Sequence, residues 1–437
     1  MPIEGLDAHV SPLFYPLFYT FGVEFELIVK YKHADRGQKR STTGGSPALG
    51  YNDRNRNAHI HGHVVEVLRQ AGLQVNAYNT RGENWICWTV KASSTIGALP
   101  GDKDQISAWS FRPVKITTPV MRFERSEEYD PFREIERMLR ALRKKLKVMV
   151  NSTCGLQVHV GAFTDPHDKQ WFFSRGFPLQ TLRNFTQLVS LFELEINALH
   201  PPTRVIHSKC CEPPSQLLPE TDDPVPLIEQ CEDFATLNRL WGDKDRYHNG
   251  HKNNNAATKD SSDGVVADSL PAYDLSALHE SDPRGDEDPR RTIVFRQHKG
   301  TLLYEDVYHW VKLAVRMVKF SHECGPGGLP LRLLRCRDEE RHWPSGHFNT
   351  ISFLKAIGAF EQAGYYCDKL YKYPRPMPLH FGYKEGEIVH DGGGSSVGCP
   401  DHTAEVCNVE KGASGKAERG EQDMADEWDL TNRELDY

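Results

Sequence analysis

The chain has 437 residues, 38% of them hydrophobic, which is enough for one large domain or two ordinary ones with a real apolar core. The formal net charge of −7 gives no overall attraction to nucleic acid or to an anionic membrane surface. No apolar run of about 20 residues could span a bilayer, the first ten residues lack a signal-peptide pattern, and the ten cysteines form no C-x-x-C pair. We therefore expect a protein without structural disulfides in the cytoplasm, or alternatively in the nucleus.

Hydrophobic periodicity and turn residues predict a mixture of strands and helices. In chain order these are a strand at Phe21–Tyr31, a helix at His59–Ala71, strands at Trp85–Val90 and Val114–Thr118, a helix at Pro131–Lys147, a strand at Gly155–Gly161, helices at Leu179–Leu199 and Leu227–Trp241, a strand at Thr292–His298, and helices at Glu305–His322 and Ile351–Leu370. The two types do not alternate strictly, which favours an α+β fold with an antiparallel sheet. No glycine-rich Rossmann or P-loop motif occurs.

Two stretches of the chain are polar and rich in turn residues. Residues 242–291 predict a disordered insertion, with Ala272–Leu278 as its one ordered segment. From Lys384 onward the chain has fourteen Asp and Glu residues against five Lys and Arg, which predicts an acidic, disordered tail at 381–437. These boundaries leave an N-terminal segment at 1–20 and one domain at 21–380.

Three of the predicted strands place chemical groups opposite an apolar face. In the first strand the odd positions are apolar, whereas Glu24 and Glu26 share the other face, about 7 Å apart. In the Gly155–Gly161 strand Gln157 and His159 lie opposite the apolar residues, and strict alternation puts Arg296 and His298 on one face of the last strand. A solvated sheet face is one explanation, but this composition favours a site.

Paired carboxylates at this spacing can bind hard cations such as Mg²⁺ through oxygen atoms. Arginine grips phosphate with two parallel donors. The combination suggests a metal–nucleotide site that uses no P-loop.

The segments FGVEFEL, TCGLQVHVG and TIVFRQHKGTL resemble motifs of the amidoligase family, carboxylate–amine ligases related to glutamine synthetase and glutamate–cysteine ligase. The resemblance extends over about residues 21–370. It implies an antiparallel sheet of glutamine synthetase type, with a concave ligand-binding face and helices packed on the other side. It also implies that ATP phosphorylates a small-molecule or peptide carboxylate, that an amine attacks the acyl phosphate, and that Mg²⁺ and arginine offset the phosphate charge.

The resemblance implies a role for each residue that matches a motif. Metal binding would fall to Glu24 and Glu26, catalysis to His159, Arg296 and His298, and cofactor binding to Arg296, Gln157 and Lys115. Several positions depart from the family pattern. Ser93, Lys115, Val294 and Leu303 stand where acidic residues are usual, and Gln157 replaces a histidine. Lys115 could occupy the place of one metal electrostatically, but its ammonium cannot coordinate Mg²⁺.

Two functions therefore stay open at this point. One is an active ATP- and Mg²⁺-dependent ligase, and the other is a degenerate member that acts as a binding or scaffold module. An acyl-transfer site made of Cys154 and His159 is excluded, because an odd spacing on one strand points them to opposite faces. The substrates and the oligomeric state are not indicated.

Four further features have an ordinary structural explanation. His59 and His63 could bind a metal one helical turn apart, but more simply mark a helix start. Glu193 and Glu195 could reach the site, although we expect them at the surface. The basic face of the Pro131–Lys147 helix is expected to be solvated, and Trp310 has the spacing of a core residue.

Overall fold

The computed structural model describes most of the region in which strands and helices were expected. The described residues are 16–32, 51–76, 86–93, 96, 109–124, 129–165, 167, 176–205, 211–219, 223–241, 270–278, 291–329, 333–334 and 348–372. The chain divides into two compact units, Met1–Arg375 and Pro376–Tyr437. The second unit lies outside the described residues, as do most of the 242–291 segment and residues 1–15 of the N-terminal segment, so the predictions of disorder there stay predictions.

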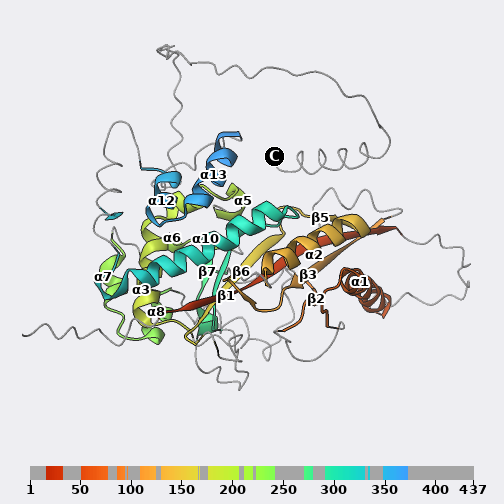
Figure 1. Cartoon of the computed structure of the whole chain (residues 1–437), viewed down its shortest axis with the longest axis horizontal. Coiled ribbons are helices and arrows are strands. Elements are labelled where there is room, and N and C mark those ends of the chain that lie inside the picture. Colours follow the sequence, from red (N-terminus) through yellow and green to blue (C-terminus); the bar gives the residue numbers. More distant parts are fainter. Residues whose placement is uncertain are drawn as a thin grey trace, which may run out of the picture. The chain divides into compact units, whose positions relative to one another are not determined.

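The first unit is built on an antiparallel sheet with β1 in its middle (Figure 1). Its main path has the order β2-β3-β1-β6-β8-β7, and two short strands pair with β1. The strands are β1 (Phe18–Lys32), β2 (Thr89–Ala92), β3 (Trp109–Thr117), β4 (Met121–Arg122), β5 (Lys147–Met149), β6 (Gly155–Phe163), β7 (Tyr273–Asp274) and β8 (Ile293–Lys299). The predicted α+β class with an antiparallel sheet is confirmed, while the comparison with glutamine synthetase stays an expectation.

One face of the sheet forms the core with the helices that cover it. Figure 1 shows α10 (Tyr304–Glu323) and α2 (Pro131–Lys145) lying along this face. Phe21 of β1 stacks on Phe132 of α2, and Phe295 of β8 meets the edge of Trp310 of α10. Trp310 is fully buried, as its helical spacing predicted. The alternating apolar residues of β1 therefore face the helices, and Glu24 faces the other way.

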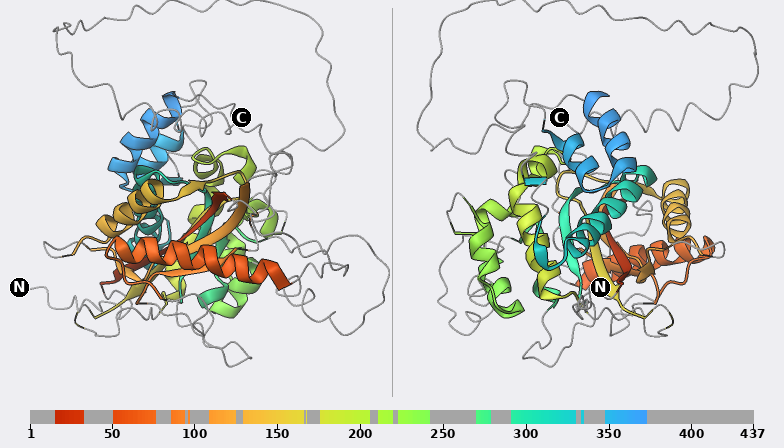
Figure 2. Two further views of the ribbon diagram at one scale, coloured as in Figure 1. Left: turned by 90° about the vertical axis from the view of Figure 1, so that its right-hand side faces the viewer. Right: turned by 60° about the vertical axis from the view of Figure 1, so that its left-hand side comes forward.

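The remaining helices surround this core. On one side α1 (Tyr51–Gln70) packs against α2, β2 and β3 (Figure 2). On the other side lie short helices and turns around α3, and α10 contacts α3 directly. These elements are α3 (Leu179–Leu191), α4 (Glu193–Asn197), α5 (Pro202–Val205), α6 (Pro214–Leu217), α7 (Val225–Glu229), α8 (Phe234–Trp241), η3 (Ser276–Leu278), η4 (Gly325–Gly327), α12 (Thr350–Ala356) and α13 (Phe360–Lys372). None of the helices described is both long and apolar enough to cross a membrane.

Three predicted long helices are each divided in two. The chain turns between α12 and α13 at Gly358, whose φ of +76° lies in the left-handed region that favours glycine. Between α7 and α8 the Asp233 side chain accepts a hydrogen bond from the Thr236 backbone at 2.6 Å, which starts a new helix. A break at Phe192 divides α3 from α4. Periodicity spans such short interruptions, so the sequence pattern alone did not reveal them.

A β-bulge interrupts the pairing of β6 with β8. Leu156 pairs with His298, but Val158 pairs with Phe295, so two residues of β8 oppose Gln157. Beyond this point the alternation in β8 is reversed. The prediction that Arg296 and His298 share a face is therefore wrong, because His298 pairs with an apolar residue on the helix-covered side.

Candidate active site on the polar face of the sheet

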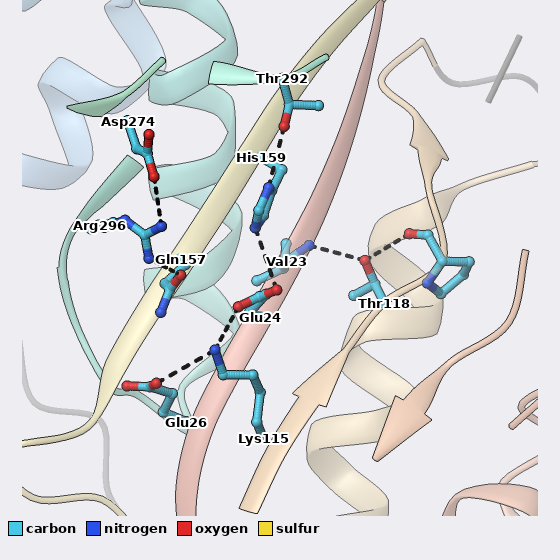
Figure 3. Close-up of polar contacts among 11 residues, drawn as sticks. Val23, Glu24, Glu26, Lys115, Thr118, Gln157, His159, Asp274, Thr292 and Arg296 are labelled. Carbon is cyan, nitrogen blue, oxygen red and sulfur yellow. Dashed lines mark hydrogen bonds and ion pairs between the residues drawn. The ribbon is translucent and has the colours of Figure 1, made fainter. Parts of the chain in front are cut away.

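Glu24 and Glu26 lie on the polar face of β1, as the alternation predicts. Glu24 is flanked by Gln157 of β6, and Glu26 by Lys115 of β3. Residues directly opposite each other in an antiparallel pair project from the same face, so the register brings Gln157 and Lys115 to the two carboxylates. In Figure 3 Lys115 points toward both carboxylates, and Gln157 points toward Arg296.

Lys115 reaches both glutamates. Its Nζ lies 2.8 Å from Oε2 of Glu24 and 3.8 Å from Oε1 of Glu26 (Figure 3). The side chain of Glu26 is only 4% exposed, that of Glu24 12%, and that of Lys115 23%. The two carboxylates thus share one ammonium group in a largely desolvated setting.

His159 continues this polar chain toward β8. Its Nε2 lies 3.6 Å from Oε1 of Glu24, and its Nδ1 lies 3.3 Å from Oγ1 of Thr292. Burial alone would raise the pKa of Glu24, but the hydrogen bonds and electrostatic interactions with His159 and Lys115 hold it well below its usual range. Glu24 is therefore an ionised carboxylate at neutral pH.

Besides Lys115, two groups contact Glu26. Its Oε2 accepts the backbone N–H of Gly155 at 2.9 Å, and its Oε1 accepts the Ser93 hydroxyl at 3.4 Å. Ser93 occupies the position where the family pattern has an aspartate. A hydroxyl donor thus contacts Glu26 at a position where the resemblance implied an acidic side chain.

Arg296 forms the second charged group of the face. Its Nη1 donates to Oε1 of Gln157 at 2.6 Å, and its Nη2 donates to Oδ2 of Asp274 at 2.9 Å. Burial would raise the pKa of Asp274, but the charge and hydrogen bond of Arg296 and the hydrogen bonds from Ser276 lower it. Arg296 and Asp274 therefore form a partly buried ion pair.

Asp274 was not recognised from the sequence. It lies in β7, within the one ordered segment predicted in the 242–291 insertion, and it pairs with Val294 of β8. β7 thus brings a carboxylate beside the position where the family pattern has a glutamate. A strand of two residues is too short to show a periodic pattern, so no sequence signal identified Asp274.

His298 is separated from this site by the sheet. Its ring lies against Trp310 and His200, with centroid distances of 5.6 and 5.9 Å, on the side of the helices. Burial lowers its pKa to about 4, so it is a neutral core residue at physiological pH. The polar face brings together Glu24, Glu26, Lys115, Gln157, His159 and Arg296 of the predicted residues, and His298 is not among them.

The glutamates of α4 are also buried, contrary to the surface position expected for them. Glu193 accepts hydrogen bonds from the backbone and the hydroxyl of Ser215 at 2.8 and 2.9 Å, and Glu195 is equally shielded.

The two histidines expected to mark a helix start lie further along their helix. His63 is exposed, and α1 begins at Tyr51, so His63 and His59 lie within the helix and not at its start.

A second arginine beside the polar face was missed as well, and its guanidinium lies close to Gly155. Arg204 of α5 is 4% exposed, and its Nη2 donates to the backbone carbonyl of Arg296 at 2.5 Å. The Sγ of Cys211 lies 2.8 Å from the same carbonyl. Since this carbonyl belongs to the bulge, Arg204 and Cys211 support the backbone that carries the Arg296 side chain. A lone arginine in a four-residue helix gives no periodic signal.

The donor set does not fit the magnesium ions that the family implies. The described residues contain no group of three or more His, Cys, Asp and Glu side chains arranged to hold a metal ion. Glu24 and Glu26 already share the Lys115 ammonium, which repels a divalent cation. An ATP phosphate would have to compete with Glu24 and Glu26 for Lys115, and with Asp274 for Arg296.

A comparison with protein families places this sheet in a known context. A family model described as "Putative amidoligase enzyme" matches residues 18–318, more than half of the chain. The match includes all the side chains of the polar face. A search of curated proteins found no match to the chain.

Proposed function

Since the chain belongs to the amidoligase family, a family of ligase-type enzymes, we propose that it is a member that keeps the active face for binding without magnesium-dependent ligation. The observation that carries this proposal is the Lys115 ammonium between Glu24 and Glu26. A lysine in this place supplies positive charge but no ligand for a metal. The fold and the polar face are retained, while the donor set for a metal–nucleotide complex is reduced.

The balance of negative and positive side chains on the polar face supports a loss of the phosphoryl-transfer step. Formation of an acyl phosphate brings the phosphates of ATP to the carboxylate of a substrate, and magnesium normally offsets this concentration of negative charge. Here the polar face has three carboxylates, Glu24, Glu26 and Asp274, and two paired cations, Lys115 and Arg296. Without a bound metal, these carboxylates would oppose the binding of a triphosphate.

The same groups suit smaller ligands with a carboxylate or an amine. Arg296 and Lys115 can donate to a carboxylate, and Glu24 can accept from an ammonium group. His159 lies between Thr292 and Glu24 and can take either hydrogen-bonding role, depending on its tautomer. We propose that the ligand is a small molecule or peptide of the substrate class implied by the family, carrying a carboxylate or an amine.

A second candidate function is ATP-dependent amide formation through an acyl phosphate. It is favoured by one observation, namely that three neighbouring strands still bring Glu24, His159 and Arg296 to one face. In that case Lys115 would act as a fixed cation beside the substrate groups. The two candidates share the site and differ in turnover.

The test is a calorimetric titration of ATP, with and without Mg²⁺, together with an assay of ADP release in the presence of pooled amino acids and polyamines. We expect no ADP release that depends on an added amine. Amine-dependent ADP release that Glu24→Gln/Glu26→Gln abolishes would favour the ligase instead. Arg133→Lys on the exposed face of α2 is the matched control, because its side chain is 78% exposed.

A further inference from the structure

The position of Lys115 is fixed by the sheet and not only by its flexible side chain. Lys115 pairs with Glu26 across the β1–β3 ladder, and the same ladder continues through Glu24, which pairs with Thr117. A lysine at this register position projects from the same face as both glutamates. Its Nζ can therefore reach Glu24 at 2.8 Å and Glu26 at 3.8 Å without any change in the backbone.

The two glutamates need a positive charge in order to lie side by side. Both are largely buried, and two ionised carboxylates on adjacent same-face positions repel each other in a low-dielectric setting. The hydrogen bonds from Gly155 and Ser93 satisfy Glu26 but bring no net charge. Lys115 is the one cation within ion-pair distance of both carboxylates among the described residues.

Two arginines near the site donate their hydrogen bonds to groups other than the two glutamates. Arg296 is bonded to Asp274 and Gln157, and the Arg204 guanidinium donates to the carbonyl of Arg296. Of the two glutamates, His159 contacts Glu24, at 3.6 Å. Of these groups, Lys115 is the one with an ion-pair contact to both carboxylates.

We propose that Lys115 is the resident cation of the polar face: its ammonium holds Glu24 and Glu26 together and keeps divalent cations away from them. The site is then assembled without any metal, and removal of the lysine charge would create a vacant acidic pair that a divalent cation can enter. This inference deepens the proposed function, on which it rests for the identity of the site. Its test measures stability and ion binding, and so is separate from any measurement of turnover.

The experiment compares the full chain with Lys115→Met and Lys115→Arg. Thermal unfolding is followed with and without Mn²⁺, and bound Mn²⁺ is counted by loss of the free-ion electron paramagnetic resonance signal. We expect the parent and Lys115→Arg to show no Mn²⁺-dependent shift. Lys115→Met should melt at least about 5 °C lower, bind one Mn²⁺ and recover part of the loss when the ion is present.

Two controls make the result specific. Arg133→Met removes a charged side chain of α2 that is 78% exposed and lies in no contact with the described residues of the polar face, and it should change neither readout. Lys115→Met/Glu24→Gln/Glu26→Gln should bind no Mn²⁺ and should melt above Lys115→Met, because it has no uncompensated charge. This triple variant also keeps the test decisive if Lys115→Met alone does not fold.

Two results would overturn the proposal. In the first, the parent itself binds Mn²⁺ and loses it in Glu24→Gln/Glu26→Gln, which would show that Lys115 does not occupy the cation position. In the second, Lys115→Met melts with the parent and takes up no ion. Turnover of ATP by a parent that passes both tests would contradict the proposed function while leaving the role of Lys115 intact.

Discussion

At the scale of single residues, the polar face contains two ion-paired groups. One contains Glu24, Glu26 and Lys115, and the other contains Arg296 and Asp274. Removing one member of such a pair leaves a partner that is desolvated and unpaired, which costs more than the pair itself contributes. A substitution that removes one charge at these positions should therefore lower the free energy of unfolding by a large amount.

Arg296→Lys tests the second group. The guanidinium spans Gln157 and Asp274 with two donors, at 2.6 and 2.9 Å, and a lysine ammonium cannot reproduce this planar fork. We expect the free energy of unfolding to fall by about 1–3 kcal/mol, measured by urea denaturation. Arg133→Lys, at an exposed pair on α2, should change it by less than about 0.5 kcal/mol. Equal effects at the two positions would argue against the buried geometry.

His298 gives a prediction for the pH dependence of stability. Its folded pKa is about 4, below the model-peptide value of 6.5, because burial opposes the charged form. Between these pH values the unfolded chain binds a proton that the folded chain does not, so stability is greatest above pH 6.5 and falls as pH drops toward 4. The loss attributable to His298 should approach about 3 kcal/mol, measured by denaturation across this range. In His298→Gln this part of the pH dependence should disappear, and an unchanged pH profile would contradict the prediction.

At the scale of elements, the β-bulge in β8 determines which groups belong to the site. The bulge lies opposite Gln157. Gly300 directly follows the end of β8, and its backbone N–H donates to the carbonyl of Cys154 at 2.8 Å. This close approach holds the end of β8 against the start of β6. Glycine is required there because a Cβ at position 300 would lie 2.6 Å from the Cβ of Cys154 and 3.2 Å from its backbone carbonyl.

Gly300→Ala is therefore expected to destabilise the protein by about 1–3 kcal/mol, since the new methyl group meets backbone atoms that cannot move freely. The matched control is Gly62→Ala in α1, where nothing lies within 4 Å of an added Cβ. Alanine is the better helix former, so Gly62→Ala should stabilise by up to about 1 kcal/mol. Urea denaturation of both variants measures the two effects. If both variants are more stable than the parent, position 300 has room for a methyl group and the close approach to Cys154 is contradicted.

The same bulge shows what the sequence could predict and what it could not. Strict alternation placed Glu24, Gln157 and His159 correctly, because β1 and β6 are regular over those positions. It failed at His298, because an inserted residue leaves no mark in a pattern of period two. The β7 strand that contributes Asp274 has only two residues, too few for any periodicity to be read. Lys115 was identifiable as a departure, but its contact with both carboxylates depends on strand register.

At the scale of the whole molecule, the core extends beyond the region that the family model matches. The match ends at residue 318, within α10, whereas Phe353 and Leu354 of α12 and Tyr366 of α13 are buried in the same hydrophobic core. α13 also anchors the start of α10, because Tyr365 and Lys369 both donate to the buried carboxylate of Asp306. The opposite oxygen of Asp306 accepts from Thr301 at 2.9 Å, in the segment between β8 and α10.

A truncation series tests whether α12 and α13 are part of the folding unit. A chain ending at Arg375 contains the whole first compact unit and serves as the reference. A chain ending at Leu329 retains every matched residue but exposes the face of α10 and leaves Asp306 with only the Thr301 hydroxyl among these partners. The burial of each aromatic or aliphatic side chain stabilises the fold by about 1.5–3 kcal/mol. Losing several of them removes more than the free energy of unfolding of a typical domain. The shorter chain should therefore show no cooperative thermal transition by circular dichroism and should be digested quickly by protease.

Asp306→Asn in the reference chain separates the ionic contribution from the apolar one, because it retains the aromatic packing and should melt cooperatively at a lower temperature. A cooperative transition of the chain ending at Leu329 near that of the reference would mean that the matched region folds on its own and that α12 and α13 are only attached to it.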